Sequence, residues 1–265
     1  MRGLHISVTL GYMDLSFLVP YELLPWQWTA WFTLGLFAGL VKAGFSGLTA
    51  AIIPVIVMIF GARESTGLTL PLLCFADIIA VIYYNRHAEW KYIFKLLPWT
   101  LAGFGVALLV ERFIPVQAFK YLIGGSILAG LIVMVLNDLR GKEKDPPSAW
   151  WFSALFGMAG GFSSLVGNVS GPIMAVFLLS MRLPKNSFVG TTAWYFLIVN
   201  YLKLPIHIFL WNTITVKTLL FDITQIPVII LGAGAGIFLI KKIPEPVFRK
   251  VIMFLTLLSS VLLFI

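Results

Sequence analysis

A short run of small and polar residues, Gly167-Asn-Val-Ser-Gly-Pro172, interrupts a long apolar segment. Glycine frees the backbone to turn, and proline suits the first turn of a helix because its missing N–H would be unpaired there. The helix that follows would present free N–H groups and the positive end of its dipole to the break. Such a terminus attracts anions, and Asn168 and Ser170 add neutral donors beside Gly171. The run predicts an anion-binding site, or else close helix packing through small residues.

A similar break occurs earlier in the chain, at Gly44-Phe-Ser-Gly47. Ser46 and Gly47 would present a hydroxyl and a backbone N–H there. Lys42 lies just before this break and well inside the apolar run. A lysine within a membrane is costly, which makes it a functional candidate that could supply positive charge for an anion. The alternative is a lysine whose side chain extends along the helix to reach the membrane surface.

Four further polar side chains sit inside apolar segments. Asn200, Lys203 and His207 are spaced three and four apart in the predicted helix 186–209, so they share one face. That face either points inward or places Lys203 and His207 at the membrane surface. Asp77 is the only acidic residue inside its own predicted helix, where it either pairs with a lysine or carries a transported proton. Asp77 and His207 are the candidates for coupling to a proton or sodium ion.

Composition defines the environment in which these side chains must work. The chain of 265 residues is 60% hydrophobic and 11% charged, with a mean hydropathy of +0.96. Ordinary soluble domains carry about 25% charged residues, so we expect an all-α integral membrane protein. The net charge of +8 comes from short loops, where membrane topology explains it, and we expect no nucleic-acid partner. We find no hydrolase, nucleotide-binding or metal-spaced motif, so we expect neither an enzyme nor a cofactor.

The sequence contains an internal repeat. Matching residues lie 129 positions apart in three successive pairs: Pro98 and Pro227, Gly103 and Gly232, Gly105 and Gly234. Upstream the match continues at smaller offsets, such as 126 for Lys91 and Lys217. Duplicated apolar halves are typical of secondary transporters, whose substrate site lies between the halves.

The repeat divides the chain into four parts. An N-terminal segment (1–27) precedes the first transmembrane copy (28–139), and a polar linker (140–149) connects this copy to the second transmembrane copy (150–265). The predicted apolar segments are 28–60, 65–84, 93–110 and 116–136, then 150–181, 186–209, 218–240 and 247–265. The first segment of each copy would span about 50 Å as one helix, against a hydrocarbon core of about 30 Å. Each is also broken near its middle, so we predict a helical hairpin, either re-entrant or made of two short spans.

The distribution of basic residues predicts the topology. If each broken segment returns to its starting side, each copy crosses the membrane an odd number of times. The two copies are then inverted, and most Lys and Arg residues gather on one face of the membrane. If each broken segment crosses once, the copies are parallel and the Lys and Arg residues divide almost evenly between the two faces. The positive-inside rule therefore favours inverted repeats, with the linker inside and both termini outside.

At these residues the chain resembles the TauE/SafE sulfite exporter family, also called the toluene sulfonate uptake permease family. The resemblance covers roughly residues 32–265. It rests on the duplicated glycine-rich break followed by an apolar run and a proline, and on stretch 181–191 leading to 199–207. Many members carry a nearly continuous glycine run at both breaks, whereas this chain has Asn168 and Ser170 in the second. The resemblance implies export of sulfite, sulfonates or other small sulfur-containing anions across the bacterial inner membrane.

These observations predict a secondary transporter of small organosulfur anions that works by alternating access within the lipid bilayer. The rival interpretations are an anion channel of the same architecture and a membrane scaffold without transport. The predicted substrate site combines both breaks with the polar face of the 186–209 helix: Lys42, Ser46, Gly47, Asn168, Ser170, Gly171, Asn200 and Lys203.

Overall fold

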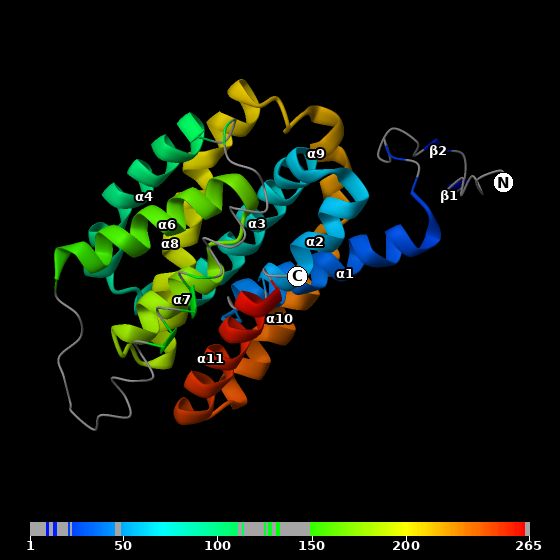
Figure 1. Cartoon of the computed structure of the whole chain (residues 1–265). Helices are drawn as coiled ribbons and strands as arrows, with labels where there is room; N and C mark the ends of the chain where they lie inside the picture. The colour runs from blue at the N-terminus through cyan, green and yellow to red at the C-terminus, as the bar shows by residue number, and fades with distance from the viewer. Residues whose placement is uncertain are drawn as a thin grey trace.

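The protein is a bundle of α-helices in a computed structural model (Figure 1). The structure describes residues 9–10, 13–14, 21, 23–45, 49–110, 113, 125, 127–128, 131–132 and 149–262. Two short antiparallel strands, β1 (Thr9–Leu10) and β2 (Met13–Asp14), precede the bundle. The predicted segment 116–136 and the linker 140–149 fall largely outside the described residues.

The first copy contains four described helices and one 3₁₀ turn: α1 (Pro25–Lys42), α2 (Thr49–Phe60), α3 (Ala62–Tyr84), η3 (Asn85–His87) and α4 (Trp90–Val110). The second contains α6 (Trp150–Gly167), α7 (Gly171–Ser180), α8 (Lys185–Pro205), the π-helix η4 (Ile206–Leu210), α9 (Val216–Ile223), α10 (Ile226–Lys242) and α11 (Glu245–Leu262). Both first segments are therefore broken where the glycine-rich runs predict.

The predicted apolar segment 218–240 is present, but it consists of two helices. Its helices α9 and α10 meet at a bend of 54°. Pro227 occupies the first turn of α10, where a proline is accommodated without losing a helical hydrogen bond. The repeat offset rises from 126 at Lys217 to 129 at Pro227, so the second copy has three extra residues here. Its counterpart α4 continues through Pro98 as one helix.

The break between α6 and α7 is a tight turn centred on Asn168. Asn168 has a left-handed backbone (φ 55°), which asparagine tolerates better than most residues. The N–H groups of Asn168 and Val169 donate to the carbonyls of Ser164 and Ser163 and close the end of α6. The ten residues of α7 rise about 15 Å, roughly half of a bilayer core, so α7 is a half-helix.

Two helix pairs join the copies through glycines. Gly103 of α4 packs against Met158 of α6, and a Cβ there would overlap the Met158 carbonyl oxygen. The equivalent glycine, Gly232 of α10, faces the carbonyl of Leu36 on α1 in the same way. The third predicted segment of each copy is therefore held against the first helix of the other copy. In Figure 1, α3 and α8 lie between these two pairs and pack on each other.

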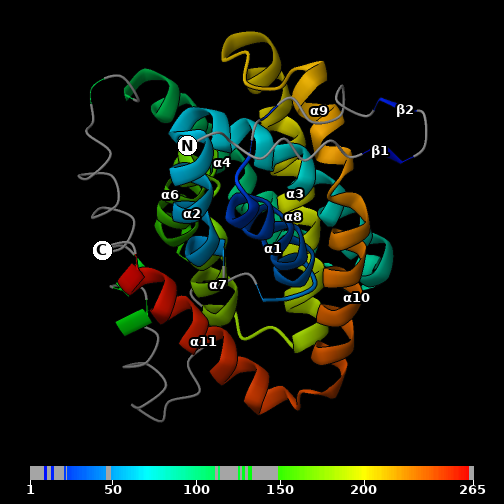
Figure 2. The ribbon, with the colours of Figure 1, turned by 90° about the vertical axis from the view of Figure 1, so that its right-hand side faces the viewer.

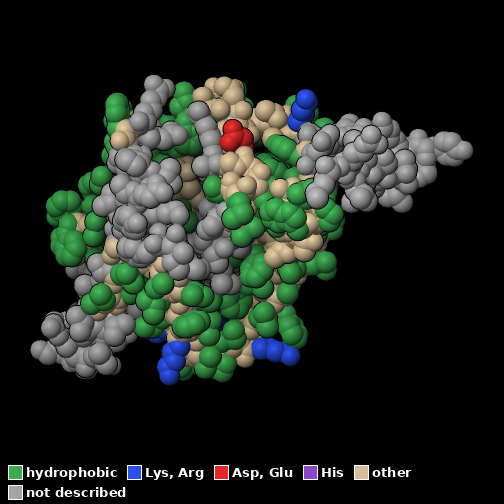
Figure 3. Space-filling view, turned by 45° about the vertical axis from the view of Figure 1, so that its right-hand side comes forward, with side chains coloured by type: hydrophobic (Ala, Val, Ile, Leu, Met, Phe, Trp, Pro, Cys, Tyr) green, Lys and Arg blue, Asp and Glu red, His purple; other side chains and the backbone are tan. Residues whose placement is uncertain are grey.

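The surface agrees with a membrane environment. Among the described residues, three helices are long and apolar enough to cross a bilayer, at 64–87, 90–110 and 185–210, and the bent α9–α10 pair is a fourth candidate. Among the described side chains on the face in Figure 3, hydrophobic ones predominate between the two ends, while Lys and Arg side chains lie near the upper and lower ends. That pattern fits an apolar band flanked by polar boundaries.

Candidate functional site

A small buried pocket lies where the second break meets α1, α3 and α8. It is lined by six of the predicted site residues, Lys42, Asn168, Ser170, Gly171, Asn200 and Lys203, together with Val41, Leu73, Ser164, Thr192 and Phe196. Its volume of about 20 Å³ is enough for about one water molecule. The pocket therefore has no room for an anion larger than water in this conformation.

Lys42 enters the pocket from the end of α1 and pairs with Asp77 of α3. Its Nζ lies 2.8 Å from Asp77 Oδ1, and both side chains are buried. Asn200 of α8 donates from Nδ2 to Asp77 Oδ2 at 2.6 Å. The Lys42 amine also lies 4.3 Å from the centre of the Phe196 ring, close enough for a cation–π contact. Burial excludes the alternative in which Lys42 reaches the membrane surface.

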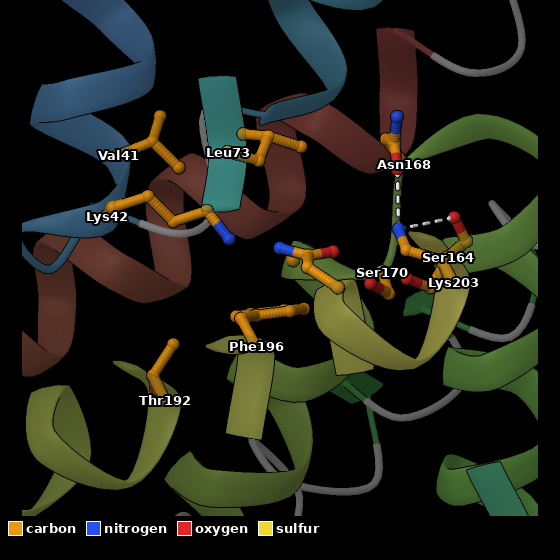
Figure 4. Close-up of a pocket in the computed structure, with 11 residues that line it drawn as sticks. Val41, Lys42, Leu73, Ser164, Asn168, Ser170, Thr192, Phe196 and Lys203 are labelled. Atoms are coloured by element: carbon orange, nitrogen blue, oxygen red, sulfur yellow. Dashed lines mark hydrogen bonds between the residues drawn. The ribbon is translucent and has the colours of Figure 1, made fainter. Parts of the chain in front are cut away.

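Lys203 enters from the opposite side and is bound to the second break (Figure 4). Its Nζ donates to Asn168 Oδ1 at 2.6 Å and to the Ser164 carbonyl at 3.1 Å. These two bonds use two of the three ammonium hydrogens, which leaves one for a ligand. Lys203 is fully buried, so it does not serve the membrane surface.

Asn168 links the break to α3 as well as to Lys203. Its Nδ2 donates to Thr69 Oγ1 at 2.9 Å and to the Thr66 carbonyl at 3.2 Å. The left-handed backbone at this residue points its amide between α3 and α8. Asn168 is thus a structural junction of the site, and its side-chain donors are already engaged by the protein.

Ser170 and Gly171 form the start of α7 beside this junction. Ser170 is 2% exposed, occupies the N-cap position and lines the pocket, yet its hydroxyl does not cap the helix. The first turn of a helix leaves N–H groups without helical acceptors and carries partial positive charge. A hydroxyl and a helix terminus therefore face the pocket beside two lysines.

The other predicted residues lie elsewhere. His207 is buried in η4, where its Nδ1 lies 2.8 Å from Thr213 Oγ1 and its ring packs edge-on against Trp211, 4.8 Å away. It does not line the pocket. Ser46 and Gly47 lie outside the described residues, so the first break stays a prediction as part of the site. Asp77 does not line the pocket itself, but it contacts Lys42, which does.

Sequence reasoning did not identify three contributors to this site. The Ser164 carbonyl accepts a hydrogen bond from Lys203, and the Thr69 hydroxyl accepts one from Asn168. The Phe196 ring makes a cation–π contact with the Lys42 amine. Ser164 belongs to the glycine-rich run that precedes the break, which was the only local signal available. Phe196 lies four residues before Asn200 on α8, so the shared helix face could have indicated it.

An apolar helical bundle whose broken helices meet a buried pocket with two lysines has the architecture of a membrane transporter. The comparison with protein families agrees: the family described as sulfite exporter TauE/SafE matches residues 31–263. The chain therefore belongs to the TauE/SafE family, is a multi-pass membrane transport protein and is not an enzyme. Comparisons with curated proteins and with solved structures gave no match.

Proposed function

We propose that this protein is a secondary transporter that exports small organosulfur anions, such as sulfite or sulfonates, across the cell inner membrane by alternating access. The observation that carries the proposal is the charge of the buried pocket. Lys42 and Lys203 contribute two positive charges and Asp77 one negative charge, which leaves a net +1. A sulfonate carries a single negative charge and would neutralise this pocket, whereas an uncompensated buried charge is costly.

The donors around the pocket suit a group with several oxygens. One hydrogen of the Lys203 ammonium, the Ser170 hydroxyl and the first turn of α7 converge on it. Charge-assisted hydrogen bonds to such oxygens are among the stronger ones in proteins. The small volume of the pocket supports a closed intermediate, because an anion larger than water could enter only after the helices separate.

Inverted repeats are part of the proposal, and two observations support them. The pairs α4–α6 and α1–α10 repeat the same glycine contact with the copies exchanged. In Figure 1, α1 begins on the right near the strands and runs left, whereas α6 begins on the left and runs right. With the linker inside, this arrangement would leave both termini outside. Coupling to a proton or sodium ion is also proposed, with Asp77 and His207 as the candidates from the sequence.

Transport by the purified protein in proteoliposomes tests the proposal, with sulfite, taurine, sulfoacetate and thiosulfate as the substrate panel. We expect saturable flux of at least one anion that is accelerated by the same anion on the opposite side. Flux without this acceleration would indicate a channel, and no flux of any anion would indicate a scaffold. Unchanged transport in both Asn168→Ala and Ser170→Ala would show that the pocket is not the substrate site.

A further inference from the structure

A second buried carboxylate, Asp222 of α9, takes no part in the pocket. Its side chain is 5% exposed, and neither carboxylate oxygen has a hydrogen-bond partner in the part of the chain that the structure describes. An isolated ionised carboxylate in such a place is very costly, so the group must be neutralised while this conformation lasts. Asp77, by contrast, is already neutralised by Lys42.

Asp222 lies next to the bend between α9 and α10. The Gln225 N–H donates to the Asp222 carbonyl at 2.9 Å, and the Gln225 side chain donates from Nε2 to the Trp31 carbonyl of α1 at 2.8 Å. Gln225 is fully buried, and its Oε1 has no hydrogen-bond partner among the described residues. Interrupted helices are where transporters bind coupling ions, because their ends leave polar groups unpaired. The extra residues of the second copy thus create a polar break that α4 lacks.

A polar cavity lies at the start of α9, one helical turn before Asp222. It has a volume of about 410 Å³ and is lined in part by Tyr21, Glu64 and Thr218. Thr218 precedes Asp222 by four residues on α9 and therefore lies on the same helix face. The Tyr21 ring packs 5.0 Å from that of Phe221, the neighbour of Asp222. Figure 2 shows α9 at the upper end of the bundle, so the cavity belongs to that end.

Few charged groups face Asp222. Tyr21 and Glu64 line the cavity, Lys217 is exposed on α9 itself, and the side chain of Arg63 lies outside the described residues. The other charged residues of the helices that pack nearby lie away from the α9 end of these helices. Lys42 is at the end of α1, Lys241 and Lys242 are at the end of α10, and Asp77 is beyond the middle of α3. None of these described groups forms an ion pair with Asp222.

We propose that Asp222 is the proton-carrying group of the transport cycle, which names the coupling ion of the proposed transporter and rests on that function. A single proton neutralises the carboxylate without further ligands, whereas a metal cation would need several oxygen atoms around it. In each cycle the carboxylate takes one proton from water in the cavity to become a neutral carboxyl group. It returns that proton to water on the other side after the α9–α10 bend has rearranged.

Anion flux and proton flux measured together in proteoliposomes test this assignment, with a pH dye trapped inside. We expect wild-type transport to move protons with the anion, and Asp222→Asn to abolish the proton flux while anion exchange at equal concentrations persists. Glu89→Gln removes an exposed carboxylate and serves as the matched control with both fluxes retained. Proton-linked transport that survives in Asp222→Asn would overturn the proposal, as would wild-type transport driven by sodium alone.

A spectroscopic measurement tests the same assignment without any transported anion. Infrared difference spectra of the wild type between neutral and alkaline pH should contain the carbonyl stretch of a buried protonated carboxylic acid, and Asp222→Asn should lack that band. Asp222→Glu should restore the band at a shifted frequency. A spectrum unchanged by Asp222→Asn would overturn the assignment even if anion transport itself is established. If the band is present but no anion is transported, the proposed function fails instead.

Discussion

Replacement of Lys42 by methionine removes one partner of a buried ion pair and keeps a side chain of similar length. Asp77 would then be fully buried, and among the described residues the Asn200 amide would be its only partner. Loss of one partner from a buried pair costs about 3–5 kcal/mol, because the remaining charge is uncompensated. Asp77→Asn should cost a similar amount by leaving Lys42 unpaired. The double variant Lys42→Met/Asp77→Asn should recover most of this loss, because neither member of the pair is then left charged without its partner.

The protein carries its own reporter for this experiment. Cys74 is the only cysteine and is buried on α3, so a thiol-reactive fluorescent dye would label it only on unfolding. For a chain of this size a loss of about 3 kcal/mol lowers the melting temperature by roughly 6–12 °C. We expect this shift in each single variant and a clearly smaller one in the double variant.

Anion transport by these variants is a second test of the charges in the pocket. The double variant keeps a net charge of +1 from Lys203 and should still bind the anion. Lys203→Met leaves a neutral pocket and removes a charged hydrogen-bond donor, so its affinity should fall about 10- to 100-fold. The reasoning would be refuted if Lys42→Met melted together with the wild type, or if the double variant were less stable than both single variants.

Three further predictions use matched pairs or a single label. Ser170→Ala should weaken anion binding at an unchanged melting temperature, whereas Ser180→Ala, which removes a hydroxyl bonded only within α7, should change neither. Gly161→Ala should destabilise the protein by at least about 2 kcal/mol, because its Cβ would overlap the backbone of α4, while Gly105→Ala has open space and should be tolerated; thermal unfolding distinguishes them. Lys142→Cys should resist labelling by a membrane-impermeant reagent in intact cells, and labelling would contradict an inside linker.

Local sequence was sufficient to predict several parts of the site. Glycine and proline runs located both breaks, since helix-breaking residues at membrane depth occur only beside protein or a cavity. The same signal selected Asn168 and Ser170. The three- and four-residue spacing on α8 placed Asn200 and Lys203 on one face, which is a property of helix geometry. Each of these inferences needed only neighbouring residues.

The remaining features depend on contacts between distant segments. The partner of Asp77 could have been any of several lysines until α1 and α3 were packed together. His207 shares a helix face with Lys203 in an ideal helix, but η4 widens the turn after Pro205 and directs it toward Thr213 instead. The bend at Gln225 was visible only as a change in repeat offset. The sequence did not indicate Asp222. What distinguishes this carboxylate is that it is buried without a hydrogen-bond partner among the described residues, and no local sequence pattern shows that.

The glycine contacts between the copies determine which helices can move as one rigid body. Close backbone packing fixes α10 to α1 and α4 to α6, so each rigid body contains helices from both halves of the sequence. In the proposed alternating access, the two halves of the chain would therefore not rock apart as separate units. Lys42 is the last residue of α1 in the α1–α10 body, and Asn168 directly follows α6 in the α4–α6 body. A small sliding of one body past the other would separate these two residues and open the pocket, without breaking any contact within either body.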